Sequence, residues 1–280
     1  MEFADFARAH GLVVDSVISG RWVRVPTTDH PRKRNGAYKW LGDVGWVQNH
    51  ATMTTPETWR AREGSVRPVD VARIRAAADR IEAATKAGWA RAAARATELL
   101  EQATPTKHGY LIRKGFGEIP GLVLPDGNLI VPMRNWRTNN MAGAQIISWD
   151  GERWNKKMLP GMRAKGAVLR LGPLQARRTW LVEGWATALS VEAATRLLAR
   201  PEAILVCFSA GNMKFVAEQL RQRGQAIAVF ADNDASGVGQ QTAREIGAPW
   251  VMSDAVGEDA NDLHKRAGLF TVSRLMMTIR

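Results

Sequence analysis

The sequence predicts an α/β protein with a C-terminal parallel sheet flanked by helices, preceded by a mainly β subdomain, a helical segment and a small β-rich N-terminal module. Beyond residue 178, short apolar runs such as AILVCF alternate with helical sequences, as in βαβ units. Between residues 120 and 172, β-like runs separated by Asp-Gly and Pro-Gly pairs predict a mostly antiparallel sheet. The alanine- and arginine-rich segment 70–103 predicts one or two helices, which Gly88 could interrupt.

These changes of pattern divide the chain into four expected parts. Residues 2–10 predict a short helix that ends at Gly11, and Asn35-Gly36 predicts a hairpin turn within the first part. The parts are a small module at 1–66, a helical linker at 67–104, a basic segment at 105–178 and an α/β domain at 179–280.

The composition is that of a globular protein, with 45% hydrophobic and 24% charged residues among 280. Cys207 is the only cysteine, which excludes an internal disulfide framework and any zinc site built on two thiolates, so we expect no zinc. No apolar run approaches the roughly 18 residues that span a bilayer, and the start lacks a signal pattern. We therefore expect a cytoplasmic protein that does not contact membranes.

The positive charge is concentrated in the first two thirds of the chain. The formal net charge is +12, and residues 180–280 contribute none of the excess, because they hold 10 basic and 11 acidic side chains. Eight of the eleven tryptophans also lie before residue 180. Bases of a single strand stack on exposed indole rings while lysine and arginine contact the phosphates. Although most tryptophans belong to cores, this distribution favours a nucleic-acid partner for the basic part.

Acidic residues follow three of the predicted parallel strands. Such residues meet at one edge of a sheet, because parallel strands end on the same side. Carboxylates at close range repel one another and require a cation, and oxygen ligands without histidine or cysteine suit Mg²⁺ or Mn²⁺. A single acidic residue could equally cap a helix, as Asp234 could. The residues of this predicted metal site are Glu183, Asp232, Asp234, Asp259 and Asp262.

A divalent ion beside a basic surface suits phosphoryl transfer. Lys165 lies in a glycine-flanked stretch just before the acidic sheet and could reach a triphosphate, although a solvated lysine is the alternative. Arg134 and Arg163 of the same basic segment are further candidates for contact with a nucleotide or a template strand.

The order of these motifs resembles the Toprim domain over residues 179–265, and more specifically the phage- and plasmid-type Toprim primases over about 104–275. The segments that carry the resemblance are HGYLIRKG (108–115), NLIVPM (128–133), LPGMRAKGAVLRLG (159–172), EGWATALSVEAAT (183–195), FSAGNMKFVAEQL (208–220) and ADNDASGVGQQTA (231–243).

The resemblance implies a role for each matching residue. Glu183 would be the acid/base or metal-linked glutamate. Asp232 and Asp234 would be metal ligands, and Asp259, with Asp262, would complete the acidic site. The family's N-terminal module is often a cysteine-bearing zinc ribbon, and residues 21–40 keep its outline without a cysteine. Contacts with nucleotide or template phosphates would come from Lys165 and Lys114. Gly211 and Asn212 resemble a turn of the family that lies near the bound nucleotide, so they are expected to contact the nucleotide or the template.

The resemblance implies a DNA primase that joins ribonucleoside triphosphates on a single-stranded DNA template. A Toprim nuclease and a non-catalytic single-strand-binding accessory protein are the alternatives. A topoisomerase is disfavoured, because Tyr38 and Tyr110, the only tyrosines, both lie outside the α/β part. No P-loop sequence occurs, so unwinding would require a separate helicase.

Overall fold

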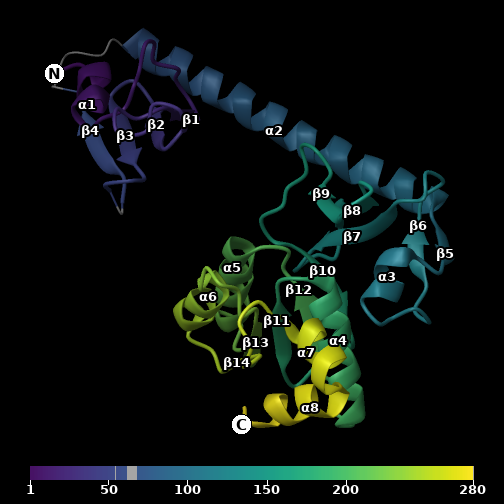
Figure 1. The fold of residues 1–280 in the computed structure, drawn as a ribbon. Coiled ribbons are helices and arrows are strands. Elements are labelled where there is room, and N and C mark those ends of the chain that lie inside the picture. The colour runs from purple at the N-terminus through teal and green to yellow at the C-terminus, as the bar shows by residue number, and fades with distance from the viewer. Residues whose placement is uncertain (54, 62–67, 280) are drawn as a thin grey trace. The chain divides into compact units, whose positions relative to one another are not determined.

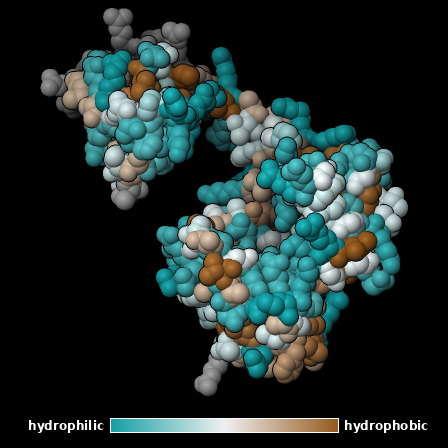
Figure 2. Space-filling view, in the orientation of Figure 1, coloured by the Kyte–Doolittle hydropathy of each residue, from teal (hydrophilic) through white to brown (hydrophobic). Residues whose placement is uncertain are grey.

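The computed structural model describes residues 1–53, 55–61 and 68–279 and divides into two compact units (Figure 1). The first comprises Met1–Ala87 and the second Gly88–Arg280. Within the described residues, no helix combines the length and apolar character needed to cross a membrane. In Figure 2, hydrophilic residues cover most of the face in view, and hydrophobic ones interrupt it in small groups.

The first unit is a four-stranded antiparallel sheet with one short helix. The helix α1 (Phe3–Ala9) is followed by its C-cap residue His10 and then by Gly11, whose φ of 76° allows the chain to turn. Phe3 packs against Gly45 so closely that a Cβ there would collide with the ring. The strands are β1 (Trp22–Val25), β2 (Gly36–Trp40), β3 (Val44–Asn49) and β4 (Glu57–Arg60), paired in this order. The predicted β-rich module is therefore confirmed.

The hairpin predicted at Asn35-Gly36 is wrong in position. Gly36 is the first residue of β2 and pairs with Val25 at the end of β1, so a ten-residue loop joins these strands. The tight turn lies instead at residues 41–43, between β2 and β3. Gly36 is needed for packing, because a Cβ there would come within 2.9 Å of the Leu12 side chain.

The alanine-rich segment forms one continuous helix, α2 (Pro68–Gln102), which Gly88 does not interrupt. The division between the two units falls within it, at Ala87 and Gly88. In the second unit, Ala92 and Ala96 are buried, and Ala96 packs against Leu124, Ile130 and Ala144. The boundary expected at 66/67 lies outside the described residues.

The second unit is built on a ten-stranded mixed sheet. Its main path runs β14-β13-β11-β12-β10-β7-β6-β5, and β8 and β9 continue from β7. The antiparallel strands are β5 (Thr104–Thr106), β6 (Gly121–Val123), β7 (Leu129–Asn135), β8 (Met141–Trp149), β9 (Trp154–Met158) and β10 (Ala167–Leu171). The parallel strands are β11 (Thr179–Val182), β12 (Ala203–Val206), β13 (Ile227–Ala231) and β14 (Trp250–Met252).

The two kinds of sheet are continuous, because β10 pairs with β7 on one side and with β12 on the other. The boundary expected at 178/179 therefore separates two parts of a single sheet. The antiparallel part and the βαβ part both agree with the predicted fold class.

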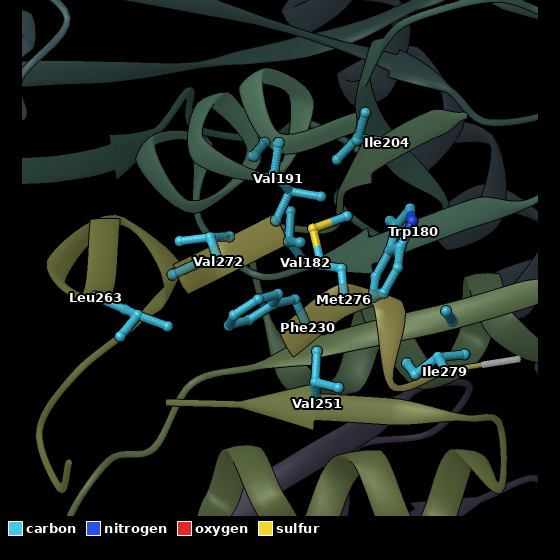
Figure 3. Close-up of a cluster of buried hydrophobic side chains, with 14 of the residues drawn as sticks. Trp180, Val182, Val191, Ile204, Phe230, Val251, Leu263, Val272, Met276 and Ile279 are labelled. Atoms are coloured by element: carbon cyan, nitrogen blue, oxygen red, sulfur yellow. The ribbon is translucent and has the colours of Figure 1, made fainter. Parts of the chain in front are cut away.

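Helices cover both faces of the parallel strands. In Figure 1, α4 (Trp185–Leu197), α7 (Ala260–Ala267) and α8 (Leu269–Met277) gather on one side, and α5 (Ala210–Arg221) and α6 (Val238–Ile246) on the other. The short helix α3 (Gly109–Arg113) packs through Tyr110 and Leu111 against α4. Successive side chains of a strand point to opposite faces of the sheet. Trp180 and Val182 therefore belong to the core drawn in Figure 3, whereas Leu181 packs in the core on the face that α5 covers.

Candidate active site at the carboxyl edge of the parallel sheet

Two acidic side chains lie at the ends of neighbouring parallel strands. Glu183 follows β11 directly and Asp232 follows β13, and these strands pair with Leu181 opposite Val229. Both residues are half-buried. The sheet therefore brings together residues that lie 49 positions apart in the sequence, as predicted from the βαβ pattern.

The electrostatics of these two carboxylates are those of a site that attracts a cation. Burial raises the pKa of Asp232 to about 7, and the charges of Asp259, Glu183 and Asp234 add to the effect. Burial also raises the pKa of Glu183, with a further contribution from Asp234. Asp232 Oδ1 is buried without a hydrogen-bond partner among the described residues, a costly arrangement for a carboxylate oxygen.

Asp234 is oriented by the turn that leads into α6. Its Oδ1 accepts hydrogen bonds from the backbone N–H and hydroxyl of Ser236, and its Oδ2 accepts one from the Gly239 N–H at 3.1 Å. These donors lower the pKa of Asp234 and keep it ionised. Gly239 is required here, because a Cβ would collide with the Asp232 carbonyl oxygen. Asp234 thus acts as a capping residue while adding charge to the edge.

Asp259 and Asp262 form a capping box at the start of α7. Asp259 Oδ1 accepts hydrogen bonds from the backbone N–H groups of Asn261 and Asp262, and its Oδ2 accepts one from Thr187 at 3.1 Å. Asp262 lies 3.7 Å from the Lys114 ammonium. Asp259 therefore caps this helix, and its charge still acts on Asp232.

Lys156 supplies the positive charge that opposes this acidic edge. Its charge lowers the pKa of both Glu183 and Asp232, and its ammonium lies 5.4 Å from the ring centroid of Tyr110. The sequence shows Lys156 only as one lysine of a basic segment. Its place opposite the carboxylates depends on the pairing of β8 with β9, where Lys156 lies opposite Ile147, and no local pattern predicts that register.

Tyr110 is a second residue that the sequence did not assign to the site. It is buried, its ring stacks on Trp185 at 6.5 Å between centroids, and burial raises its pKa to about 12. Asp259 and Asp262 raise this pKa further, which places the phenol within their electrostatic reach. A phenol that stays protonated at neutral pH is a poor nucleophile.

Lys165 and Arg163 are exposed, and each lies over an aromatic ring. The Lys165 ammonium is 4.7 Å from the centroid of Phe215 in α5, and the Arg163 guanidinium is 4.8 Å from that of Trp89. No hydrogen bond or ion pair joins either side chain to the acidic edge within the part of the chain that the structure describes. Their predicted contact with phosphates stays a prediction.

Asn212 holds the loop that carries Lys165. Its Oδ1 accepts a hydrogen bond from Gly166 N–H at 2.7 Å, and its Nδ2 donates to the carbonyl oxygens of Ala167 and Cys207. These bonds occupy the buried amide, so it positions the loop. The neighbouring Gly211 is exposed and has open space where a Cβ would lie.

Among residues 1–53, 55–61 and 68–279, no group of three or more histidine, cysteine, aspartate or glutamate side chains is arranged as a metal site. The donor set nevertheless fits a divalent cation: the Glu183 carboxylate makes no hydrogen bond within the described chain, and Asp232 Oδ1 is buried and unpartnered. Mg²⁺ typically uses one or two carboxylates and retains waters. Asp234 could contribute further, whereas capping occupies Asp259.

Comparison with known families confirms the predicted resemblance for the C-terminal region. Residues 178–269 match the model of the Toprim domain, about a third of the chain. This range contains Glu183, Asp232, Asp234, Asp259 and Asp262.

Two solved structures are similar to a larger part of the chain. One is the RNA polymerase domain of Mycobacterium tuberculosis primase DnaG, 15% identical, covering 70% of this chain and 83% of that one with a TM-score of 0.39. The other is a chain of the bacteriophage T7 lagging-strand DNA polymerase complex with primase domains of two gp4 subunits bound to an RNA/DNA hybrid and dTTP. It is 16% identical and covers 63% of this chain and 90% of that one, with a TM-score of 0.41.

Proposed function

We propose that this protein is a primase that synthesises short RNA primers on single-stranded DNA. The observation that carries the proposal is the pair Glu183 and Asp232, which end neighbouring strands inside the region that matches the Toprim domain. In the reaction, a 3′-hydroxyl attacks the α-phosphate of an incoming ribonucleoside triphosphate, a new phosphodiester bond forms and pyrophosphate leaves.

Glu183, Asp232 and Asp234 would hold Mg²⁺ or Mn²⁺ at this edge. Such an ion, when bound, stabilises the charge that develops on the transferring phosphate. The Glu183 carboxylate makes no hydrogen bond within the described chain, and its raised pKa suits a carboxylate that accepts the proton of the attacking hydroxyl. Asp234, held by Ser236 and Gly239, keeps a fixed negative charge beside it.

Lysines around the edge would bind the phosphates of the nucleotide. Lys156 acts on the charges of both Glu183 and Asp232, so it is the lysine best placed for this role. Lys114 lies 3.7 Å from Asp262 at the same edge. Lys165, on the loop that Asn212 holds, would contact the triphosphate or the template from the α5 side.

The basic part of the chain would bind the template strand. Trp22 and Trp149 have exposed fractions of 48% and 45%. Each ring therefore offers a face on which a base could stack. The cysteine-free N-terminal module would take part in template binding, and a separate helicase would open the duplex.

The test is primer synthesis by the full chain on short single-stranded templates with labelled ribonucleotides and Mg²⁺ or Mn²⁺. We expect short labelled products from the wild type and none from Asp232→Ala or Glu183→Ala. Glu152→Ala is the matched control, because Glu152 is an exposed carboxylate whose side chain makes no hydrogen bond or ion pair within the described chain. It should synthesise primers at the wild-type rate.

Other outcomes would redirect the assignment. Cleavage of the template without extension, lost in the same two variants, would identify a Toprim nuclease. Salt-sensitive strand binding without products or cleavage would identify an accessory protein.

A further inference from the structure

A cavity of about 290 Å³ lies beside β7 and β10, in the antiparallel part of the sheet. Arg134, Asn139, Val168, Arg170 and Leu174 are among its lining residues. No acidic side chain of the described chain lines it. The cavity is therefore positively charged, and its two arginines have no carboxylate partner there.

Arg170 is the more unusual of the two arginines. It is half-buried, and its side chain forms no hydrogen bond or ion pair with any residue that the structure describes. Its neighbours Leu169 and Leu171 pack against the cores on the α4 side, so Arg170 points with Val168 to the opposite face. Burial lowers its pKa, because a partly desolvated cation lacks a compensating charge. An anion in the cavity would supply that charge.

Arg134 is exposed and lines the same cavity. It lies opposite Val168 in the pairing of β7 with β10, so the two side chains share a face. Its Nη1 donates a 3.1 Å hydrogen bond to the carbonyl oxygen of Asn139, whose φ of 59° is rare outside glycine. A guanidinium has five N–H donors, so four remain for a ligand.

The cavity is separate from the acidic edge. In the sheet order β11-β12-β10-β7, Arg134 lies three strands away from the strand that ends at Glu183. Neighbouring strands are about 4.8 Å apart, which gives a lateral separation of roughly 14 Å. A ligand in the cavity would therefore occupy a different site from a nucleotide at the carboxylates.

We propose that this cavity is a phosphate-binding site in which Arg134 and Arg170 hold one phosphate group, of a free nucleotide or of a single-stranded nucleic acid. Planar guanidinium groups match phosphate geometry and bind it through paired hydrogen bonds. The proposal does not depend on primer synthesis, since it concerns residues away from the acidic edge.

Calorimetric titration of the full chain in EDTA tests the proposal, because removing divalent ions disfavours nucleotide binding at the carboxylates. The ligands are pyrophosphate, ATP and an oligothymidylate of about 12 nucleotides, within the usual site sizes of strand-binding domains. The variants are Arg170→Gln and Arg170→Lys. Arg244→Gln, which removes an exposed arginine of α6, is the control.

We expect Arg170→Gln to weaken binding about tenfold or more, Arg170→Lys to recover part of it, and Arg244→Gln to match the wild type. If Arg170→Gln loses affinity for pyrophosphate and ATP, the ligand is a free phosphate compound. If the variant loses affinity for the oligonucleotide alone, the ligand is a phosphate of a nucleic-acid strand. In that case, the slope of the logarithm of its binding constant against the logarithm of salt concentration should be smaller by about 0.7 than that of the wild type. Wild-type affinity of Arg170→Gln for all three ligands overturns the proposal, as does a wild type that binds none.

A second measurement covers the case in which Arg170→Gln does not fold. Phenylglyoxal modifies accessible arginines, and mass spectrometry of the treated wild type reports each site. The bound ligand should protect Arg134 and Arg170 and leave Arg244 reactive. Equal modification with and without ligand overturns the proposal.

Discussion

The side-chain amide of Asn261 in α7 donates a 2.8 Å hydrogen bond to the carbonyl oxygen of Lys114, which follows α3. Asn261 is fully buried and donates also to the hydroxyl of Ser190 at 3.3 Å. This contact joins segments 147 positions apart and accompanies the approach of the Lys114 ammonium to Asp262. The position of Lys114 at the acidic edge thus depends on a buried amide of the Toprim region.

Replacing Asn261 by alanine should reduce the free energy of unfolding by about 1–3 kcal/mol, because the Lys114 carbonyl oxygen and the Ser190 hydroxyl lose a buried donor. Urea unfolding followed by circular dichroism measures the change. Asn140→Ala is the control, since Asn140 is exposed. Equal midpoints for the two variants would show that the contact contributes nothing.

The Asp232→Asn variant should alter how stability depends on pH. Because the folded pKa is about 7 and the ordinary value is 3.8, the wild type loses stability as pH rises between these values. The penalty is full above pH 7 and reaches up to about 4 kcal/mol, at about 1.36 kcal/mol for each pKa unit. Asparagine does not ionise, so the variant lacks this loss.

Thermal unfolding in EDTA measures the effect at pH 5 and pH 8. The melting temperature of Asp232→Asn relative to the wild type should be higher at pH 8 than at pH 5. Any cost of the unpaired asparagine amide is common to both pH values and cancels in the comparison. A difference independent of pH would contradict the raised pKa.

Mg²⁺ or Mn²⁺ should stabilise the wild type at neutral pH, since an ion that binds only the folded chain shifts unfolding by mass action. The gain is about 2.7 kcal/mol at an ion concentration one hundred times the dissociation constant. It should shrink at low pH, because the carboxylates must be ionised to bind. Asp232→Ala should show no gain, whereas Glu152→Ala should keep it; a shift equal in both variants would argue against this site.

Trp149→Ala should weaken binding of single-stranded DNA by about 1–3 kcal/mol, the range found for stacking of one base on an aromatic ring. Trp149 is 45% exposed and lies 5.1 Å from Trp154, measured between ring centroids. Fluorescence anisotropy of a labelled oligonucleotide reports the affinity. Phe270→Ala, which removes a 68% exposed aromatic side chain from α8, should bind as the wild type does; equal affinities of all three proteins would exclude Trp149 from the interface.

Glu183 and Asp232 were predictable as site residues because each directly follows an apolar strand, and parallel strands end at one edge. Lys156 was not, because its position depends on the register of β8 against β9. Asn212 was assigned to ligand contact from a resemblance, whereas the structure shows its amide engaged with Gly166, Ala167 and Cys207. A short motif does not reveal whether a polar side chain is already hydrogen-bonded.

The sequence alone determined three features: the βαβ order of elements, the antiparallel strands before it and the acidic residues at one edge of the sheet. These features follow from periodicity and turn residues, which act over a few positions. Tertiary structure alone decided that β10 joins both sheet types and that Lys156 opposes Glu183 and Asp232. It also decided that the Arg170 side chain is half-buried with no hydrogen bond or ion pair to the residues that the structure describes. Those features arise from pairing between distant segments, whose register follows from packing of the whole sheet.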